Sequence, residues 1–141
     1  MRRVVVTGLG IVSSIGNDAS EVTESLRQAK SGISFAPDFA EHGFRCQVWG
    51  KPDLDPTDLV DRRAMRFLSQ GGAWNHVAMK QALADSGLEE KDYSENERTG
   101  IIMGSGGPST RTLIEAADIT IKNGSPKRIG PFAMPKAMPS T

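Results

Sequence analysis

The side chains that could perform nucleophilic chemistry are a single thiol and, as its bases, two histidines. A cysteine becomes nucleophilic when a histidine or a helix amino terminus beside it stabilises the thiolate. Cys46 follows His42 by four residues in a segment without helical periodicity, whereas His76 falls inside a predicted helix. These placements favour a packed or half-exposed strand residue over a catalytic Cys46. Two histidines without acidic residues at ligand spacing also predict no metal site.

Glycine-rich turns suggest a second chemistry, the binding of phosphate groups. Gly8 and Gly10 follow a run of valines, but a dinucleotide fingerprint needs its third glycine where Ser13 stands. A turn that lets a strand and a helix pack closely is therefore favoured over nucleotide binding. The sequence also has no Gly-Lys-Ser or Gly-Lys-Thr, which a phosphate-binding P-loop requires.

A second glycine turn, residues 104–107, contains a serine. A nucleophile elbow needs a glycine two places before its serine, and Met103 stands two places before Ser105. The turn is better interpreted as bare backbone that a ligand or a neighbouring chain can approach, with a purely structural turn as the equal alternative.

Three arginines form a compact cluster of positive charge: Arg62, Arg63 and Arg66. Their spacings of three and four residues make them neighbours on a helix. The cluster, with a second basic pair at residues 127–128, could dock an acidic partner. The alternative is a solvated helix face neutralised by Asp58 and Asp61, and spacing alone favours this alternative.

Charge and composition restrict the partners and the compartment. The 141 residues carry 17 Lys+Arg and 17 Asp+Glu, so we expect no non-specific binding to nucleic acid or to an anionic membrane. Hydrophobic residues at 38% and charged residues at 24% are typical of a soluble globular chain. One cysteine excludes an internal disulfide framework, and the apolar run after Arg3 is too short for a signal peptide. We expect a cytoplasmic protein.

The elements that must position these residues alternate between strand and helix patterns. Valines predict a buried strand at residues 4–6, and a short helix with caps at residues 17–20 is expected to end at Gly32. Further elements are a doubtful strand at residues 45–49, a long buried helix over residues 58–86, a strand at residues 99–103 and a helix over residues 111–122. The class is α/β, but about five or six strands are usual for a complete sheet, so the sheet is incomplete.

Taken together, several motifs resemble the β-ketoacyl-acyl-carrier-protein synthases, the condensing enzymes of bacterial fatty acid synthesis. The resemblance runs from residue 1 to about residue 138, and Val48-Trp49-Gly50 with Lys136-Ala137-Met138 is more similar to synthase I than to synthase II. The other motifs are Val4-Val5-Val6-Thr7-Gly8-Leu9-Gly10-Ile11-Val12-Ser13-Ser14-Ile15-Gly16, Asp61-Arg62-Arg63, Gly104-Ser105-Gly106-Gly107 and Gly130-Pro131-Phe132. Three positions depart from the family pattern, namely Pro135, Pro139 and Gly124.

The resemblance implies a thiolase-like fold, layered α/β/α/β/α, in a homodimer whose subunits are roughly three times as long. Residues 1–141 would then be the amino-terminal part of the first half, with a sheet that downstream residues complete. The implied activity is decarboxylative Claisen condensation of an acyl thioester with malonyl carrier protein, without a cofactor. The family's catalytic cysteine, two histidines and lysine are expected downstream of Thr141, so the 141-residue chain by itself should be inactive.

The resemblance also implies supporting roles for residues within the chain. Arg62, Arg63 and Arg66 match the surface that docks the acidic acyl carrier protein, and Lys127 matches a basic position contributed across the dimer. Gly106 and Gly107 match a turn near the acyl pocket, and Met138 matches a residue that lines the pocket of the partner subunit.

Two other functions remain open from the sequence. One is a short non-catalytic paralogue that binds acyl carrier protein through the arginine cluster. The other is a small nucleotide-binding oxidoreductase, which is supported only by Gly8 and Gly10. With strand edges unpaired and a helix apolar on several faces, the isolated chain is expected to aggregate or to be partly molten.

Overall fold

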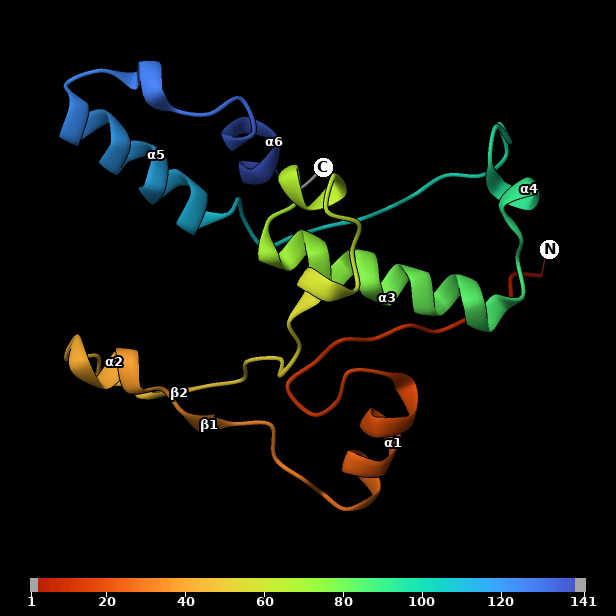
Figure 1. Cartoon of the computed structure of the whole chain (residues 1–141). Coiled ribbons are helices and arrows are strands. Elements are labelled where there is room, and N and C mark those ends of the chain that lie inside the picture. The colour runs from red at the N-terminus through yellow and green to blue at the C-terminus, as the bar shows by residue number, and fades with distance from the viewer. Residues whose placement is uncertain (1–2, 139–141) are drawn as a thin grey trace. The chain divides into compact units, whose positions relative to one another are not determined.

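A computed structural model describes residues 3–138 of the chain (Figure 1). The chain divides into two compact units, one of residues 1–55 and 77–88, the other of residues 56–76 and 89–141. The described part is mostly helical, with these elements in order: α1 (Ala19–Arg27), β1 (Ser34–Phe35), α2 (Pro37–Glu41), β2 (Val48–Trp49), 3-10 helices η1 (Pro56–Asp58) and η2 (Ala64–Arg66), α3 (Gln70–Ser86), α4 (Glu90–Tyr93), α5 (Thr110–Asn123), 3-10 helix η3 (Pro126–Arg128) and α6 (Ala133–Ala137).

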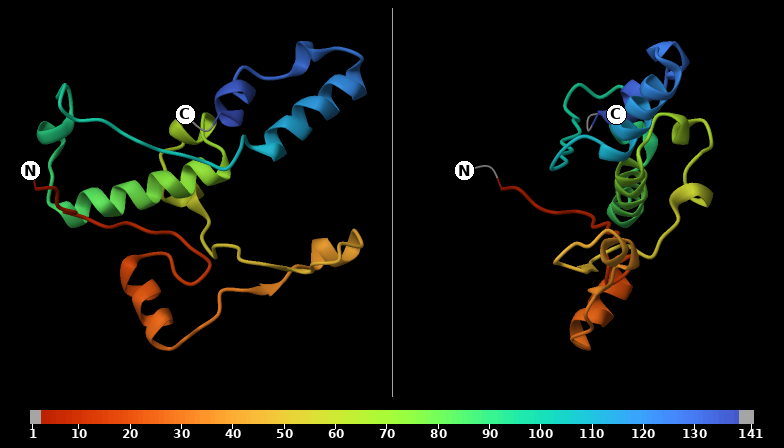
Figure 2. Two further views of the ribbon diagram at one scale, coloured as in Figure 1. Left: turned by 180° about the vertical axis from the view of Figure 1, so that it is seen from behind. Right: turned by 90° about the vertical axis from the view of Figure 1, so that its left-hand side faces the viewer.

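In the first unit an extended segment takes the place of the strand predicted at residues 4–6. The exposed fractions of Val4, Val5 and Val6 are 91%, 64% and 81%, so these valines are not buried. Figures 1 and 2 show the segment after these valines, residues 7–11, running beside the carboxyl-terminal part of α3. The prediction of a buried strand was wrong because a strand needs a neighbouring strand, and none pairs with these residues in the described part of the chain.

Side chains of α3 replace the missing strand as hydrogen-bond acceptors for the next residues. Leu9 N–H donates to Asp85 Oδ2 at 2.9 Å, and Ile11 N–H donates to Gln81 Oε1 at 2.9 Å. Gly8 and Gly10, which precede Leu9 and Ile11, allow the backbone of this segment to contact the backbone of α3.

Gly8 and Gly10 lie directly against the backbone of α3. A Cβ on Gly8 would meet the Ala82 carbonyl oxygen, and one on Gly10 would meet the Ala78 carbonyl oxygen. The interpretation of these glycines as a close-packing motif is confirmed, although the segment they belong to is not a strand.

Helix α1 begins and ends with hydrogen-bonded caps. Asp18 caps its amino end by accepting from the Glu21 N–H at 2.8 Å. At the other end Lys30 N–H donates to Ser25 O at 2.8 Å and Ala29 takes a left-handed φ of 53°. The predicted stop at Gly32 was therefore wrong. Gly32 instead makes a close approach, since a Cβ there would lie 2.5 Å from Ser14 Oγ.

The two short strands β1 and β2 pair antiparallel, with Ser34 opposite Trp49. The strand predicted at residues 45–49 is thus confirmed only at its last two residues. A small aromatic cluster packs beside the pair, with the Phe39 ring centroid 5.2 Å from that of Phe44 and 5.8 Å from that of Trp49. Cys46 precedes β2 and is exposed, so the expectation of a packed or half-exposed strand residue was wrong, because only Val48 and Trp49 pair with β1.

The long helix predicted over residues 58–86 is interrupted. Helix α3 begins only at Gln70, after η1, a turn and η2. Asp61 Oδ1 accepts from the Arg63 N–H at 2.8 Å, and Ser69 Oγ accepts from the Gly72 N–H at 3.2 Å, so each side chain starts a new helical segment. The paired glycines, residues 71–72, therefore lie in the first turn of α3 rather than in a helix interior, where they would be more costly.

The second unit places no strand at residues 99–103, in contrast to the prediction. Ile101 and Ile102 are exposed in an extended segment, again without a strand beside it in the described residues. The helix predicted over residues 111–122 is confirmed, since α5 spans Thr110–Asn123. Figure 2 shows α5 beside η3 and α6. Pro135 lies in the first turn of α6, where proline is tolerated, whereas Pro139 lies outside the described residues.

Few side chains are buried in the described residues. The buried hydrophobic residues there are Ala36, Val60, Ala73 and Val77. The predicted α/β class is thus confirmed only in part, since the described residues are mostly helical and form one two-stranded sheet. The strands predicted at residues 4–6 and 99–103 are not formed there. Among the described helices none has the length and apolarity that crossing a bilayer requires.

Candidate functional site

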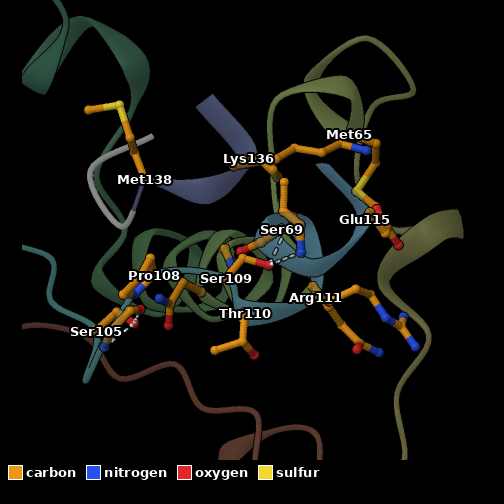
Figure 3. Close-up of a pocket in the computed structure, with 17 residues that line it drawn as sticks. Met65, Ser69, Ser105, Pro108, Ser109, Thr110, Arg111, Glu115, Lys136 and Met138 are labelled. Atoms are coloured by element: carbon orange, nitrogen blue, oxygen red, sulfur yellow. Dashed lines mark hydrogen bonds between the residues drawn. The ribbon is translucent and has the colours of Figure 1, made fainter. Parts of the chain in front are cut away.

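A hollow of about 500 Å³ lies in the second unit, where α3 and α5 both begin (Figure 3). Its wall comes from η2, from the first turns of α3 and α5, from the turn at residues 105–109 and from the end of α6. Phe67, which follows η2, packs edge-to-face on Phe132, which precedes α6, with 5.1 Å between ring centroids. This aromatic contact joins the segments next to η2 and α6, which both contribute to the wall of the hollow.

Serine side chains cap both helices that start at the hollow. Ser69 Oγ accepts from Gly72 N–H at 3.2 Å at the start of α3, and Ser109 Oγ accepts from Thr112 N–H at 3.4 Å at the start of α5. The partly positive amino ends of both helices therefore face this part of the molecule. Arg111 and Lys136 add positive charge to the lining, and Glu115 adds negative charge.

The structure brings together two of the three residues predicted near an acyl pocket. Gly107 and Met138 both line the hollow, whereas Gly106 is next to a lining residue without being one. Ser105 Oγ donates to Gly107 O at 2.7 Å and so shapes the turn. Nothing lies within 4 Å of the position that a Cβ on Gly106 or Gly107 would take, so the backbone of the turn is open to approach.

The lining is more polar than an acyl pocket would need. Its apolar side chains are Met65, Leu68, Pro108 and Met138, against a larger number of hydroxyl, amide and charged groups. Ligand pockets for long apolar groups are lined mostly by hydrophobic side chains. The acyl-pocket role of Gly106, Gly107 and Met138 therefore stays a prediction.

The arginine cluster is exposed, on a turn and a 3-10 helix instead of the helix face that spacing predicted. Arg62 and Arg63 lie in the turn, and Arg66 ends η2, with its N–H donating to Arg63 O at 3.2 Å. One carboxylate oxygen of Asp61 accepts hydrogen bonds from the backbone N–H groups of Arg63 and Ala64. Within residues 3–138, the two ion pairs found are Arg27 with Glu24 and Lys91 with Glu89, so neither involves the cluster. Neutralisation by neighbouring aspartates thus has no support from the structure.

Lys127 lies apart from the arginine cluster. It is exposed in η3, and its N–H donates to Ser125 Oγ at 3.3 Å. In both Figure 1 and Figure 2, η3 lies along α5 and away from η2. The structure contains one chain, so a contribution of Lys127 across a dimer stays a prediction.

The candidate nucleophile lies in no catalytic arrangement. Cys46 Sγ donates weakly to Val48 O at 3.8 Å, and His42 Nδ1 lies 2.8 Å from Asp38 O, so the nearby histidine contacts the backbone of its own helix instead of the thiol. His76 lies in α3. Across the described part of the chain, His, Cys, Asp and Glu residues form no group that could hold a metal ion.

The residues predicted for the site did not include the capping serines or Arg111. The signals were present in local sequence, because Ser69 precedes Gln70-Gly71-Gly72 and Ser109 follows Pro108. A serine immediately before a helical pattern predicts a helix start, and two such starts indicate two helix amino ends that tertiary structure can bring together. That the two helix starts meet at one hollow depends on tertiary packing, which residue spacing does not predict.

Comparison with known proteins places the chain in a family. The family model of the beta-ketoacyl synthase N-terminal domain matches residues 1–141. The 3-oxoacyl-[acyl-carrier-protein] synthase 1 of Escherichia coli K12 is 46% identical over 99% of this chain, and that of Haemophilus influenzae is 41% identical over 100%. The synthase 2 of Coxiella burnetii is 33% identical over 97% of the chain. Each match covers 33% or 34% of the relative, so the chain spans about a third of their length.

Solved structures agree in fold. A β-ketoacyl synthase from Burkholderia phymatum superposes with a TM-score of 0.81 at 23% identity, covering 99% of this chain and 34% of that one. The ishigamide ketosynthase/chain length factor gives a TM-score of 0.77 at 26% identity, covering 95% of this chain and 33% of that one. The described helices are thus part of a thiolase-like fold, and the chain belongs to the beta-ketoacyl synthase family, whose N-terminal domain it matches from residue 1 to residue 141.

Proposed function

We propose that the chain forms the amino-terminal part of a 3-oxoacyl-[acyl-carrier-protein] synthase of type 1. The observation that carries the proposal is the 46% identity to the Escherichia coli synthase 1 across nearly the whole chain, against 33% to a synthase 2. The reaction would be decarboxylative condensation of an acyl thioester with malonyl carrier protein in fatty acid biosynthesis. The whole enzyme would act as a cytoplasmic homodimer.

In this proposal the chemistry would be performed by residues outside the 141-residue chain. An acyl group would pass to a cysteine thiolate, two histidines would assist decarboxylation of the malonyl unit, and backbone N–H groups would hold the oxyanion that forms when the new carbanion attacks the thioester. Cys46, His42 and His76 are not arranged for these roles. The 141-residue chain alone would therefore not catalyse condensation.

The chain's own contribution would be recognition of the carrier protein. Arg62 and Arg63 in a turn and Arg66 at the end of η2 are exposed, and no ion pair occupies them among residues 3–138. Such unpaired positive charge attracts an acidic partner and accelerates its association. Lys127 would add a cation from the other subunit of the dimer.

The glycine turn and Met138 would border the acyl group. Gly106 and Gly107 leave the backbone bare, and Met138 lies at the edge of the same hollow as Gly107. A flexible methionine side chain adapts to apolar groups of different length. The polar side chains of the hollow would surround the amino ends of α3 and α5. The acyl chain would extend from the hollow toward residues of the enzyme outside this chain.

An intact-mass and activity measurement on the natural protein tests this proposal. Antibodies raised against the 141-residue chain would isolate the protein from its source cells, and its mass would be compared with the calculated 15.2 kDa. We expect a mass about three times larger, since the chain covers 34% of its relatives, together with condensation of acyl and malonyl carrier protein. A protein of that larger mass without condensing activity would contradict the proposal. A 15.2 kDa product that binds carrier protein would favour the non-catalytic paralogue.

A further inference from the structure

The carboxyl end of α5 carries an Asn-Gly pair. Asn123 is the last residue of the helix, and Gly124 follows it with a left-handed backbone, φ 61° and ψ 17°. The sequence has four asparagines, and Asn123 is the one that precedes a glycine. Both residues of the pair are exposed, and nothing lies within 4 Å of the position that a Cβ on Gly124 would take.

This pair has a known intrinsic chemistry that needs only water. The backbone nitrogen of the residue after an asparagine can attack the side-chain Cγ. A Cγ–N bond forms, the Cγ–Nδ2 bond breaks, and the nitrogen's proton leaves with Nδ2 as ammonia. Water then opens the cyclic imide to aspartate or to its β-linked isomer. A side chain on the following residue hinders the attack, and glycine has none.

In the folded helix both reacting nitrogens are engaged. Asn123 Nδ2 donates to Ile119 O at 2.7 Å, which directs the side-chain amide back along the helix. Gly124 N–H, the attacking group, donates to Ile121 O at 3.4 Å and also to Thr120 O, and Ser125 N–H donates to Thr120 O at 3.2 Å. Ring closure requires the bond of Asn123 Nδ2 and the bonds of Gly124 N–H to break.

We propose that Asn123 is a site of spontaneous deamidation that the carboxyl cap of α5 holds closed. Helix ends are the parts of a structure that open at the lowest free energy. Each opening of this cap frees the Gly124 nitrogen and the Asn123 amide at the same time. The rate of amide loss is therefore set by how often the end of α5 opens.

The product changes charge at a sensitive position. Deamidation places a carboxylate at a helix carboxyl end, where negative charge opposes the helix dipole. It also removes the donor to Ile119 O, so the last turn of α5 loses a hydrogen bond. From residue 119 to residue 138 the chain has four basic residues and no acidic one, and the new carboxylate lies beside Lys122.

Asn96 provides an internal control. Its Nδ2 donates to Asp92 O at 3.0 Å, the same contact with a carbonyl four residues back, but Glu97 follows it. The whole protein, isolated from its source cells, would be incubated at neutral pH in buffer and in concentrated urea. Amide loss at each asparagine would be followed by peptide mass mapping. We expect Asn123 to lose its amide several-fold faster than Asn96 in urea, and several-fold more slowly in buffer than in urea.

Equal rates at the two asparagines in urea, or equal rates at Asn123 in buffer and in urea, would overturn the proposal. Asn123→Gln keeps an amide but lengthens the side chain, and we expect it to abolish the modification at this position. Asn123→Asp imitates one product, and we expect faster amide hydrogen exchange at Gly124 and Ser125 than in Asn123→Gln. Unchanged exchange in Asn123→Asp would contradict the stated effect on the cap.

Discussion

At the scale of single residues, Gly10 tests whether the amino-terminal segment is seated on α3. Gly10→Ala would bring a Cβ against the Ala78 carbonyl and to 2.7 Å from the Ala82 nitrogen. Overpacking of this kind costs about 1–3 kcal/mol, so we expect the N–H groups of Leu9 and Ile11 to exchange about ten to one hundred times faster. Gly130→Ala, where nothing lies within 4 Å, is the matched control and should leave these amides unchanged. Unchanged exchange in Gly10→Ala would refute the contact.

Ala29 tests the cap of α1. Its φ of 53° lies in the left-handed region, which costs an alanine about 1–2 kcal/mol more than a glycine. Ala29→Gly should therefore stabilise the end of α1 by up to about 1 kcal/mol after the entropy of glycine is subtracted. The measurement is protection of the Lys30 N–H, which donates to Ser25 O. Lys30→Gly is the control, since Lys30 has no left-handed φ, and it should decrease protection. A decrease in Ala29→Gly as well would show that this cap is not formed.

At the scale of elements, the helix starts depend on serine caps. Ser69→Ala removes the acceptor of the Gly72 N–H and should destabilise the first turn of α3 by about 1 kcal/mol. Ser69→Asp keeps an acceptor and should restore most of the loss. Helicity measured by circular dichroism, with hydrogen exchange at Gly72, reports the effect. Equal helicity in the alanine and aspartate variants would mean that Ser69 is not the cap.

Local signals predicted the helices better than the strands, for a physical reason. Helix α5 fell within one residue of its predicted ends because its hydrogen bonds are all made within the segment, and Ser109 and Gly124 mark its limits. The valines at residues 4–6 and the isoleucines at residues 101–102 carry β propensity, but a strand needs a partner from elsewhere in the chain. The break before α3 was missed because Asp61 and Ser69 compete for backbone N–H groups that an uninterrupted helix would use.

Some residues of the candidate site could be predicted from the sequence, but their arrangement around one hollow could not. The arginine cluster is evident in the sequence, but the structure places it on a turn and a 3-10 helix instead of the helix face that spacing predicted, and its docking role stays a prediction. Gly107 and Met138 were named from a resemblance, and the structure places both at one hollow. Their meeting depends on where α3, α5 and α6 pack, which no local sequence pattern encodes.

At the scale of the whole molecule, apolar surface dominates the behaviour of the chain. Val4, Val6, Ile101 and Ile102 are more than three-quarters exposed on extended segments, which favours pairing between copies. We expect the 141-residue chain to bind a hydrophobic dye, to aggregate with rising concentration and to melt without a sharp transition. Val5→Lys with Ile102→Lys should reduce aggregation, whereas Val5→Ile with Ile102→Val should not. A soluble monomer with a sharp cooperative melt would contradict this picture.

We have proposed that the arginine cluster recognises an acidic carrier protein, and a binding titration provides the test. Acyl carrier protein would be titrated into the whole protein that contains the chain and into its variant with Arg62→Glu, Arg63→Glu and Arg66→Glu. The control variant carries the same charge change on other exposed cations, Arg27→Glu, Lys30→Glu and Lys51→Glu. Three exposed ion pairs at about 0.5 kcal/mol each amount to about tenfold in affinity. We expect binding that salt weakens and an affinity that falls about tenfold or more in the cluster variant alone. Equal affinity of the two variants, or binding that the cluster variant leaves intact, would contradict it.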